Sequence, residues 1–449
     1  MPAEPQTDAL SLLQDLIDKA RTAGADAADA VLFDGASLSL AQRLGKPERL
    51  ERAEGCDLGL RVFVGRCQAI VSTTDRSPDT LRELVDRAVA MARTVPEDPF
   101  CGIADPDQLA REWPDLDICD DYEPAAEELI EQARIAEEAA LAVAGVTNSE
   151  GAEASWSRSS VVMAASNGFH GGYSVSRRSL SVSVLAGAGT AMERDYEYSS
   201  KVYGNDLADS AEIGRQAGEK AVRRLNPRKV RTCKVPVVYD PRASRSLLGH
   251  LSGAITGPAI ARGTSFLKDM MGETLFRSSI TVIDDPHIRR GLRSKPFDGE
   301  GVAMTRRNII EEGRLTTWLL DLRSARQLGL TSTGHASRGT SSPPSPSPTN
   351  FYMAPGPRSP AELMADIGEG LYVTELMGMG VNGITGDYSR GASGFWIENG
   401  QIAYPVSELT VAGNLKDIFR ELEPASDVEF RYGVDAPTIR IDGMTIAGM

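Results

Sequence analysis

The sequence contains little cysteine and little histidine, the residue types on which many metal and nucleophilic sites depend. Its 449 residues include five cysteines and four histidines. The cysteines are odd in number, widely spaced and without a Cys-x-x-Cys pair: Cys56, Cys67, Cys101, Cys119 and Cys233. This pattern favours reduced, cytoplasmic thiols over a disulfide framework or a thiolate metal site.

Excess positive charge and long apolar runs are also lacking. The net charge is −15, which repels a nucleic-acid backbone. The best local basic group is short and flanked by acids, and we predict a solvated loop there: Arg289, Arg290, Arg293 and Lys295. No run of about 18 apolar residues occurs, so no membrane span is expected. Residues 1–5 show no cationic start to a secretory signal, so we expect a cytoplasmic protein without nucleic-acid or membrane partners.

What is present is the composition of a globular protein, with 41% hydrophobic and 25% charged residues. Up to residue 228, apolar periodicity predicts helices at 8–24, 77–92, 124–145 and 209–225. Between them, strands are predicted at 30–33, 38–43, 58–64, 153–158, 160–165, 169–176 and 179–186, with an Asn167-Gly168 hairpin. Helix, strands and helix occur in this order twice, which suggests two similar halves.

After residue 228 the pattern changes to short strands and glycine-rich turns. A strand at 235–239 leads into a helix at 240–255, and one more helix is expected at 360–369. The Ser/Pro-rich segment 339–349 is predicted to be mobile or polyproline-like. The predicted fold is therefore α+β. Residues 1–228 form a domain of helices packed on antiparallel strands, and residues 229–449 form a β-rich domain opened by one helix.

The second half carries long, distinctive motifs at 284–302, 371–392, 394–400, 404–416 and 444–448. They include Gly386-Asp-Tyr-Ser-Arg-Gly-Ala392, Tyr404-Pro-Val-Ser-Glu-Leu-Thr410 and Met444-Thr-Ile-Ala-Gly448. These segments resemble the TldD/PmbA family, and the three quoted ones resemble its PmbA branch, also called TldE. The glycines of 371–392 lack a phosphate-loop pattern, and we predict that they permit tight turns.

The resemblance implies a cytoplasmic, heterodimeric zinc protease built from TldD and TldE. Such an assembly processes or degrades peptides, as in microcin-type maturation and antitoxin degradation, and an unfolded or extended peptide enters between the subunits. The TldD subunit holds the zinc with a His-Glu-x-x-x-His helix and a distal cysteine. An older label of the family is modulator of DNA gyrase.

The helix at 240–255 is where this chemistry would be placed, but it retains only His250. If His250 is the last residue of the motif, Arg245 and Ser246 replace the first histidine and the glutamate. If His250 is the first residue, Leu251 replaces the glutamate and Ile255 replaces the second histidine. No cysteine follows Cys233. A guanidinium about 4 Å from a dication would repel it by roughly 8 kcal/mol at an effective dielectric of about 20. We therefore predict a degenerate motif (Arg245, Ser246, His250) and a non-catalytic subunit that binds no zinc, with zinc in a TldD-like partner.

Two alternatives remain open at this stage. The chain is itself a metallopeptidase with displaced ligands drawn from His250, His287, Asp284 and Asp285, or it is a non-proteolytic binding protein of the gyrase-modulator kind. The simpler interpretation of His250 is a hydrogen-bonded histidine in a packed helix, and that of Asp284–His287 is an ordinary turn. His170 and His335 are predicted to be structural or solvated. In isolation, the chain could pair with a second copy through the face that binds its partner.

Overall fold

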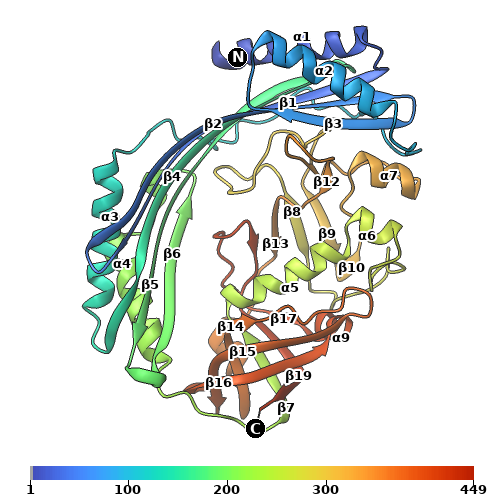
Figure 1. Cartoon of the computed structure of the whole chain (residues 1–449). Helices are drawn as coiled ribbons and strands as arrows, with labels where there is room; N and C mark the ends of the chain where they lie inside the picture. The colour runs from blue at the N-terminus through green and yellow to red at the C-terminus, as the bar shows by residue number, and fades with distance from the viewer. Residues whose placement is uncertain (1–3, 449) are drawn as a thin grey trace.

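The fold is dominated by one long sheet that curves around a β-rich C-terminal half, as a computed structural model of residues 4–448 shows (Figure 1). The sheet has six antiparallel strands in the order β3-β2-β1-β4-β5-β6. Their bounds are β1 Ala27–Arg43, β2 Lys46–Val64, β3 Cys67–Thr73, β4 Val146–Ala165, β5 His170–Ala186 and β6 Glu193–Lys201. The mixture of helices and antiparallel strands confirms the predicted α+β class.

Two helix pairs cover the outer face of this sheet, one at each end (Figure 1). Helices α1 (Glu4–Thr22) and α2 (Pro78–Ala92) share a core with one end. Helices α3 (Ala126–Leu141) and α4 (Ser210–Arg223) share a core with the other. Among the helices of residues 4–448, none is long and apolar enough to cross a membrane.

The long strands β1, β4 and β5 correct the prediction of two short strands in each place, and β2 begins well before the predicted strand at 58–64. Strand β1 runs unbroken through 34–37, where the sequence is polar and Asp34 is exposed. Leu32 belongs to the core under α1 and α2, whereas Leu38 belongs to the core under α3 and α4. The polar interval is therefore the part of the strand between the two helix pairs. The same reason joins the predicted pieces of β4, because Val162 belongs to the first core and Trp156 to the second. The predicted Asn167-Gly168 hairpin is present between these strands.

The C-terminal half contains two further sheets of more than two strands. One has the order β10-β9-β8-β13-β18, and the other has the order β16-β15-β14-β7-β19-β17. In the second, β16 also pairs with β19, so that β7, β14, β15, β16 and β19 form a closed ring. The bounds of the ring sheet are β7 Cys233–Tyr239, β14 Glu369–Met377, β15 Asp387–Glu398, β16 Gln401–Asn414, β17 Glu423–Pro424 and β19 Ile439–Ala447. Those of the other sheet are β8 Val282–Asp285, β9 Arg307–Glu311, β10 Arg314–Leu315, β13 Asn350–Met353 and β18 Val434–Asp435.

Helix α5 (Pro241–Ala254) packs against strands of both C-terminal sheets and contributes to one core with them. The sequence missed the short helices α6 (Gly257–Ala261), α7 (Leu322–Leu328) and α9 (Leu415–Glu421). The last predicted helix, at 360–369, was also too long, because α8 spans only Pro360–Met364 and β14 begins at Glu369. Helices of five to seven residues have too few apolar repeats for periodicity to reveal them.

The Ser/Pro-rich segment 339–349 is anchored against the inner face of the long sheet. Its two ends, Thr340 and Thr349, are buried, and the Thr340 hydroxyl donates to Asp57. A Cβ atom on Gly59 would lie 2.3 Å from the Thr340 carbonyl oxygen, so this approach requires glycine. Strand β11 (Ala336–Ser337), just before the segment, pairs with strand β12 (Ser345–Pro346) within it. The predicted mobility is therefore wrong for the anchored ends.

Candidate functional site

Helix α5 begins as its sequence predicts. The Asp240 carboxylate caps it by accepting a hydrogen bond from the backbone N–H of Arg242 at 3.0 Å, and Pro241 occupies the first turn. Leu247, Leu248 and Leu251 point into the core. The opposite face of the helix, which carries Arg245 and His250, is the surface on which the family resemblance places chemistry.

The three residues of the degenerate motif do not converge on one point. The Arg245 guanidinium lies 4.4 Å from the centroid of the Tyr432 ring, and the Ser246 hydroxyl donates to the Ala243 carbonyl oxygen at 2.7 Å. The His250 ring packs edge-on to Tyr388, with 6.0 Å between centroids. Within residues 4–448, His250 Nε2 is buried without a hydrogen-bond partner, which corrects the expectation of a hydrogen-bonded histidine at this atom.

The electrostatic surroundings of His250 oppose a cation. Burial lowers the pKa of its imidazole, and the nearby positive charge of Arg390 lowers it further. The Arg390 side chain donates to the Met377 carbonyl oxygen at 3.3 Å, so it is held in this position. An imidazole that is held neutral beside the positive charge of Arg390 does not favour binding of a zinc ion.

A zinc ion needs about three protein ligands, and the side chains present do not supply them. In the described part of the chain, no group of three His, Cys, Asp or Glu residues could hold a metal ion. Asp284 accepts hydrogen bonds from the Thr349 backbone and hydroxyl. Asp285 accepts one from the backbone N–H of His287 at 2.9 Å, as in an ordinary turn. The residues of α5 and of this turn therefore do not fit the metal that the resemblance implies.

The remaining histidines have separate surroundings. Within residues 4–448, His287 Nε2 is buried and has no hydrogen-bond partner, and burial lowers the pKa of its ring. His335 is buried, with Nδ1 2.8 Å from the Thr333 hydroxyl and Nε2 3.4 Å from Asp284. His170 is exposed on the hairpin, with Nδ1 3.3 Å from the Gly168 carbonyl oxygen. His335 and His170 thus fill the structural and solvated roles predicted for them.

A cavity of about 350 Å³ lies beside the start of α5, between the long sheet and the C-terminal half. Strand β6 and helix α4 form one wall, and α5, β14 and the loop at 427–432 form another. Tyrosine side chains contribute to both walls: Tyr196, Tyr198, Tyr372 and Tyr432. Its size lies at the lower end of the range for small-molecule and peptide-fragment sites.

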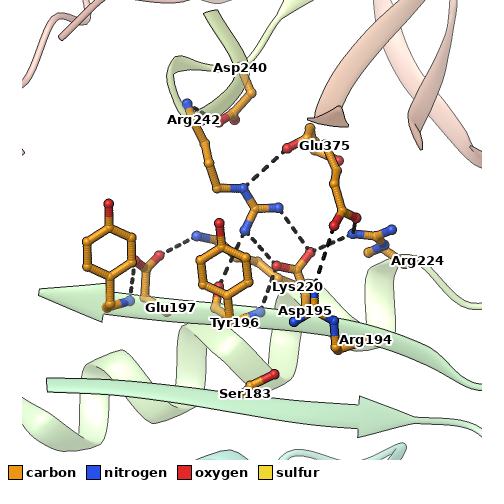
Figure 2. A network of polar contacts seen from close by, with 12 residues as sticks. Ser183, Arg194, Asp195, Tyr196, Glu197, Lys220, Arg224, Asp240, Arg242 and Glu375 are labelled. Carbon is orange, nitrogen blue, oxygen red and sulfur yellow. Dashed lines mark hydrogen bonds and ion pairs between the residues drawn. The ribbon is translucent and has the colours of Figure 1, made fainter. Parts of the chain in front are cut away.

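Ion pairs between charged side chains connect the two walls of the cavity (Figure 2). Asp195 of β6 lies 2.7 Å from Arg242 of α5 and 3.3 Å from Arg224, which pairs at 2.6 Å with Glu375 of β14. Glu197, two residues further along β6, pairs with Lys220 and, at 2.7 Å, with Arg431. Residues from five segments of the chain thus connect the walls of the cavity.

These ion pairs keep the carboxylates charged. Burial raises the pKa of Asp195, but bonds from Arg242 and the charge of Arg224 outweigh it and leave the pKa lowered. For Glu197, burial is likewise outweighed by Lys220 and Arg431. Each carboxylate is occupied by cations, so neither is free to serve as a general base. The carboxylates of β6 therefore serve to hold the walls of this cavity together.

Sequence reasoning missed this cavity because it missed strand β6. The run Glu193-Arg-Asp-Tyr-Glu-Tyr198 alternates strictly, with Asp195 and Glu197 on the buried side and Tyr196 and Tyr198 on the other. Charged residues on the buried side conceal the usual apolar pattern of a strand. The alternation of aromatic and acidic residues was the pattern from which this strand could have been predicted.

The basic group at 289–295 corrects another prediction. Arg289 and Arg290 are exposed and pair with Asp117, as a solvated loop would. Arg293 and Lys295, however, are half-buried beneath the long sheet, and burial lowers the pKa of both side chains. The solvated-loop prediction is therefore wrong for this pair.

Comparison with known families and proteins places these features in context. The chain matches the PmbA/TldA metallopeptidase domain 1 at 28–92, the central domain at 120–225 and the C-terminal domain at 232–448. It is 40% identical to Metalloprotease PmbA of Escherichia coli O157:H7, over 94% of this chain and 92% of that protein.

Two solved structures share the fold over nearly all of their length. A Bacteroides thetaiotaomicron protein, described as a candidate modulator of DNA gyrase, is 29% identical with a TM-score of 0.90, covering 98% of each chain. TldE from Thermococcus kodakarensis has a TM-score of 0.88 at 20% identity, covering 97% of this chain and 100% of that one. Because three domain models and a full-length relative agree, the chain belongs to the PmbA/TldD metallopeptidase family.

Proposed function

We propose that this chain is the non-catalytic subunit of a heterodimeric peptidase, whose second subunit is a TldD-like family member that carries the zinc. The observation that carries the proposal is the state of helix α5. Arg245 is stacked on Tyr432, Ser246 is bonded to its own helix and His250 lies beside Arg390. The substrate class follows from the family, whose members are metallopeptidases, and we expect an unfolded or extended peptide.

A partner surface is suggested by the turn between β14 and β15, residues 378–386. Met379 is 90% exposed and Ile384 is 63% exposed, and the adjoining Met377 is half-exposed. Methionine-rich exposed patches are common at binding surfaces. Arg390, the neighbour of His250, bonds the Met377 carbonyl, so this turn lies next to the motif face of α5.

The turn presents these side chains in a fixed shape. The Asn382 side chain accepts a hydrogen bond from the backbone N–H of Ile384 at 2.9 Å, and the Gly386 N–H donates to the Asn382 carbonyl oxygen at 2.8 Å. A Cβ atom on Gly380 would lie 1.9 Å from the Ser389 carbonyl oxygen. The glycines therefore permit the close turn that the sequence predicted. A preformed turn loses little conformational entropy on binding.

The test combines metal analysis with peptide cleavage, with and without a zinc-bearing family member. We expect the isolated chain to contain no stoichiometric zinc and to cleave nothing, and cleavage to appear on mixing. Failure of the two chains to form a complex would refute the proposal. If the isolated chain instead holds zinc, cleaves peptides and loses both properties in His250→Ala, it is a metallopeptidase with displaced ligands.

A substitution in the turn tests the partner surface. Met379→Asp should weaken the complex about tenfold or more, because a charge would be buried against the partner. Met91→Asp, on an exposed methionine of α2 at the far end of the long sheet, is the matched control and should have little effect. Sedimentation of the isolated chain shows whether two copies pair through the same turn, in which case Met379→Asp should shift the chain to monomer.

A further inference from the structure

A second cavity, of about 320 Å³, lies between the inner face of the long sheet and the segment 292–295. Strand β4 contributes Ser157 and Ser159, and β5 contributes Tyr173 and Arg177. Arg293 and Lys295 face it from the C-terminal half. Its walls thus come from both halves of the chain, and it shares no lining residue with the cavity beside α5.

The charge of this cavity is entirely positive. Arg177, Arg293 and Lys295 line it, and no acidic residue does. Within residues 4–448, none of the three forms an ion pair. Arg177 donates to the Leu292 carbonyl oxygen at 3.3 Å and Arg293 donates to the Ser347 hydroxyl at 3.2 Å. In a chain of net charge −15, three unpaired cations around one cavity are a marked departure.

A smaller adjoining cavity of about 210 Å³ extends the same site, because Tyr173 and Lys295 line both. Arg338 lines it with a side chain only 1% exposed, and its Nε and Nη2 atoms have no hydrogen-bond partner in the described residues. Asp298 also lines this cavity, but both of its carboxylate oxygens already accept backbone N–H groups of the loop. Donors therefore outnumber acceptors here as well.

Buried cations and donors without partners are costly, and each is satisfied by an anion. Burial lowers the pKa of Lys295 and of Arg293, and nearby carboxylates such as Asp298 and Asp284 offset this effect only in part. Burial also raises the pKa of Tyr173 to about 12, so its hydroxyl stays protonated and can donate. An oxyanion with several acceptor oxygens would complement these groups together.

We propose that the two connected cavities between the long sheet and residues 292–299 form a binding site for a small oxyanion, a carboxylate or phosphate group. Lys295 is its central contact because it faces both cavities. Arg177 and Arg293 stand at the larger cavity, and Arg338 supplies the two free donors at the smaller one. The site belongs to this chain alone and does not depend on a zinc-bearing partner.

The test measures anion binding to the full chain by calorimetry at constant ionic strength. The probes are inorganic phosphate, a short peptide with a free C-terminal carboxylate and the same peptide as its amide, with sodium chloride as the blank. Binding of phosphate assigns the site to a free anion; binding of the acid but not of the amide or phosphate assigns it to a peptide end. Heat no greater than the chloride blank for all three probes would overturn the proposal.

Variants locate the site. Lys295→Gln should weaken binding about tenfold or more, the loss expected for one charge-assisted hydrogen bond. Arg177→Gln, on an exposed side chain whose loss leaves the core intact, should weaken it several-fold and guards against misfolding of the first variant. Lys268→Gln, on an exposed lysine outside both cavities, should bind as the parent does. Equal affinity of Lys295→Gln, Arg177→Gln and the parent would overturn the assignment.

Discussion

Helix α5 and the junction between the long sheet and the C-terminal half differ in how their charges are used. On α5, Arg245 lies over an aromatic ring, and His250 Nε2 has no hydrogen-bond partner within residues 4–448. At the junction, four almost fully buried residues form what we call the junction cluster: Asp29, Arg61, Glu300 and Arg338. The residues of the predicted motif on α5 thus lie apart from one another, whereas the four residues of the junction cluster are buried together.

The junction cluster joins segments far apart in sequence. Asp29 of β1 accepts hydrogen bonds from Arg61 of β2, at 2.9 Å, and from Arg338. Glu300 lies 3.5 Å from the Arg61 guanidinium and accepts the backbone N–H of Leu322 at 2.8 Å. Burial raises the pKa of Asp29, but the two arginines outweigh it and keep the pKa lowered. Such groups are costly to separate because each would remain buried without its partner.

The largest expected effect is therefore that of breaking the cluster. Asp29→Ala should lower the free energy of unfolding by about 3–5 kcal/mol, because it leaves two buried guanidinium groups short of a counter-charge. Urea denaturation measures the change. Asp15→Ala, which removes an exposed partner of Lys19 on α1, is the control and should change stability far less. Equal losses would show that the cluster contributes no more than a surface pair.

A smaller, pH-dependent effect is expected at Glu300. Burial raises its pKa from the ordinary 4.5 to about 8 despite the charge of Arg61. The folded protein then holds this proton more tightly than the unfolded chain, so stability from this group falls as the pH rises from about 4.5 to about 8. Glu300→Gln should flatten the dependence of unfolding free energy on pH in that window. Glu83→Gln, on an exposed residue of α2, should leave the curve unchanged.

At α5 the effects should be smaller still. Arg245→Ala should cost about 0.5–1 kcal/mol, the contribution of one partly exposed cation–π contact with Tyr432. Thermal unfolding with Arg262→Ala as the control, on an exposed arginine after α6, measures it. A loss of several kcal/mol would mean that Arg245 takes part in a buried charge network, as Arg242 does.

The smallest effect is expected for His250→Leu. The change removes a buried nitrogen that has no partner in the described residues and keeps an apolar contact with Tyr388, so stability should stay equal or rise slightly. Denaturant titration together with metal analysis checks this. A marked loss of stability, accompanied by loss of bound metal, would make His250 a ligand and reverse the comparison between α5 and the junction.

Local features of the fold were readable from sequence where the signal was itself local. Ser77-Pro78 and Asp240-Pro241 correctly marked the starts of α2 and α5, because capping and proline geometry act within one turn. Polar intervals led to wrongly predicted strand ends where a strand passes from one helix pair to the next, as β1 does at Asp34. Strand β6 was not predicted, because its buried side carries Asp195 and Glu197, whose ion-pair partners lie on other segments.

The sequence by itself determined the α+β class and the family, because these depend on residue types and their order. Tertiary structure alone decided which charges are buried together. Asp29 and Arg338 are 309 positions apart, and Arg177 and Lys295 meet only because the long sheet curves around the C-terminal half (Figure 1). A charge contributes most to stability when it is removed from water, and which charges are removed from water depends on the tertiary structure rather than on the order of the residues.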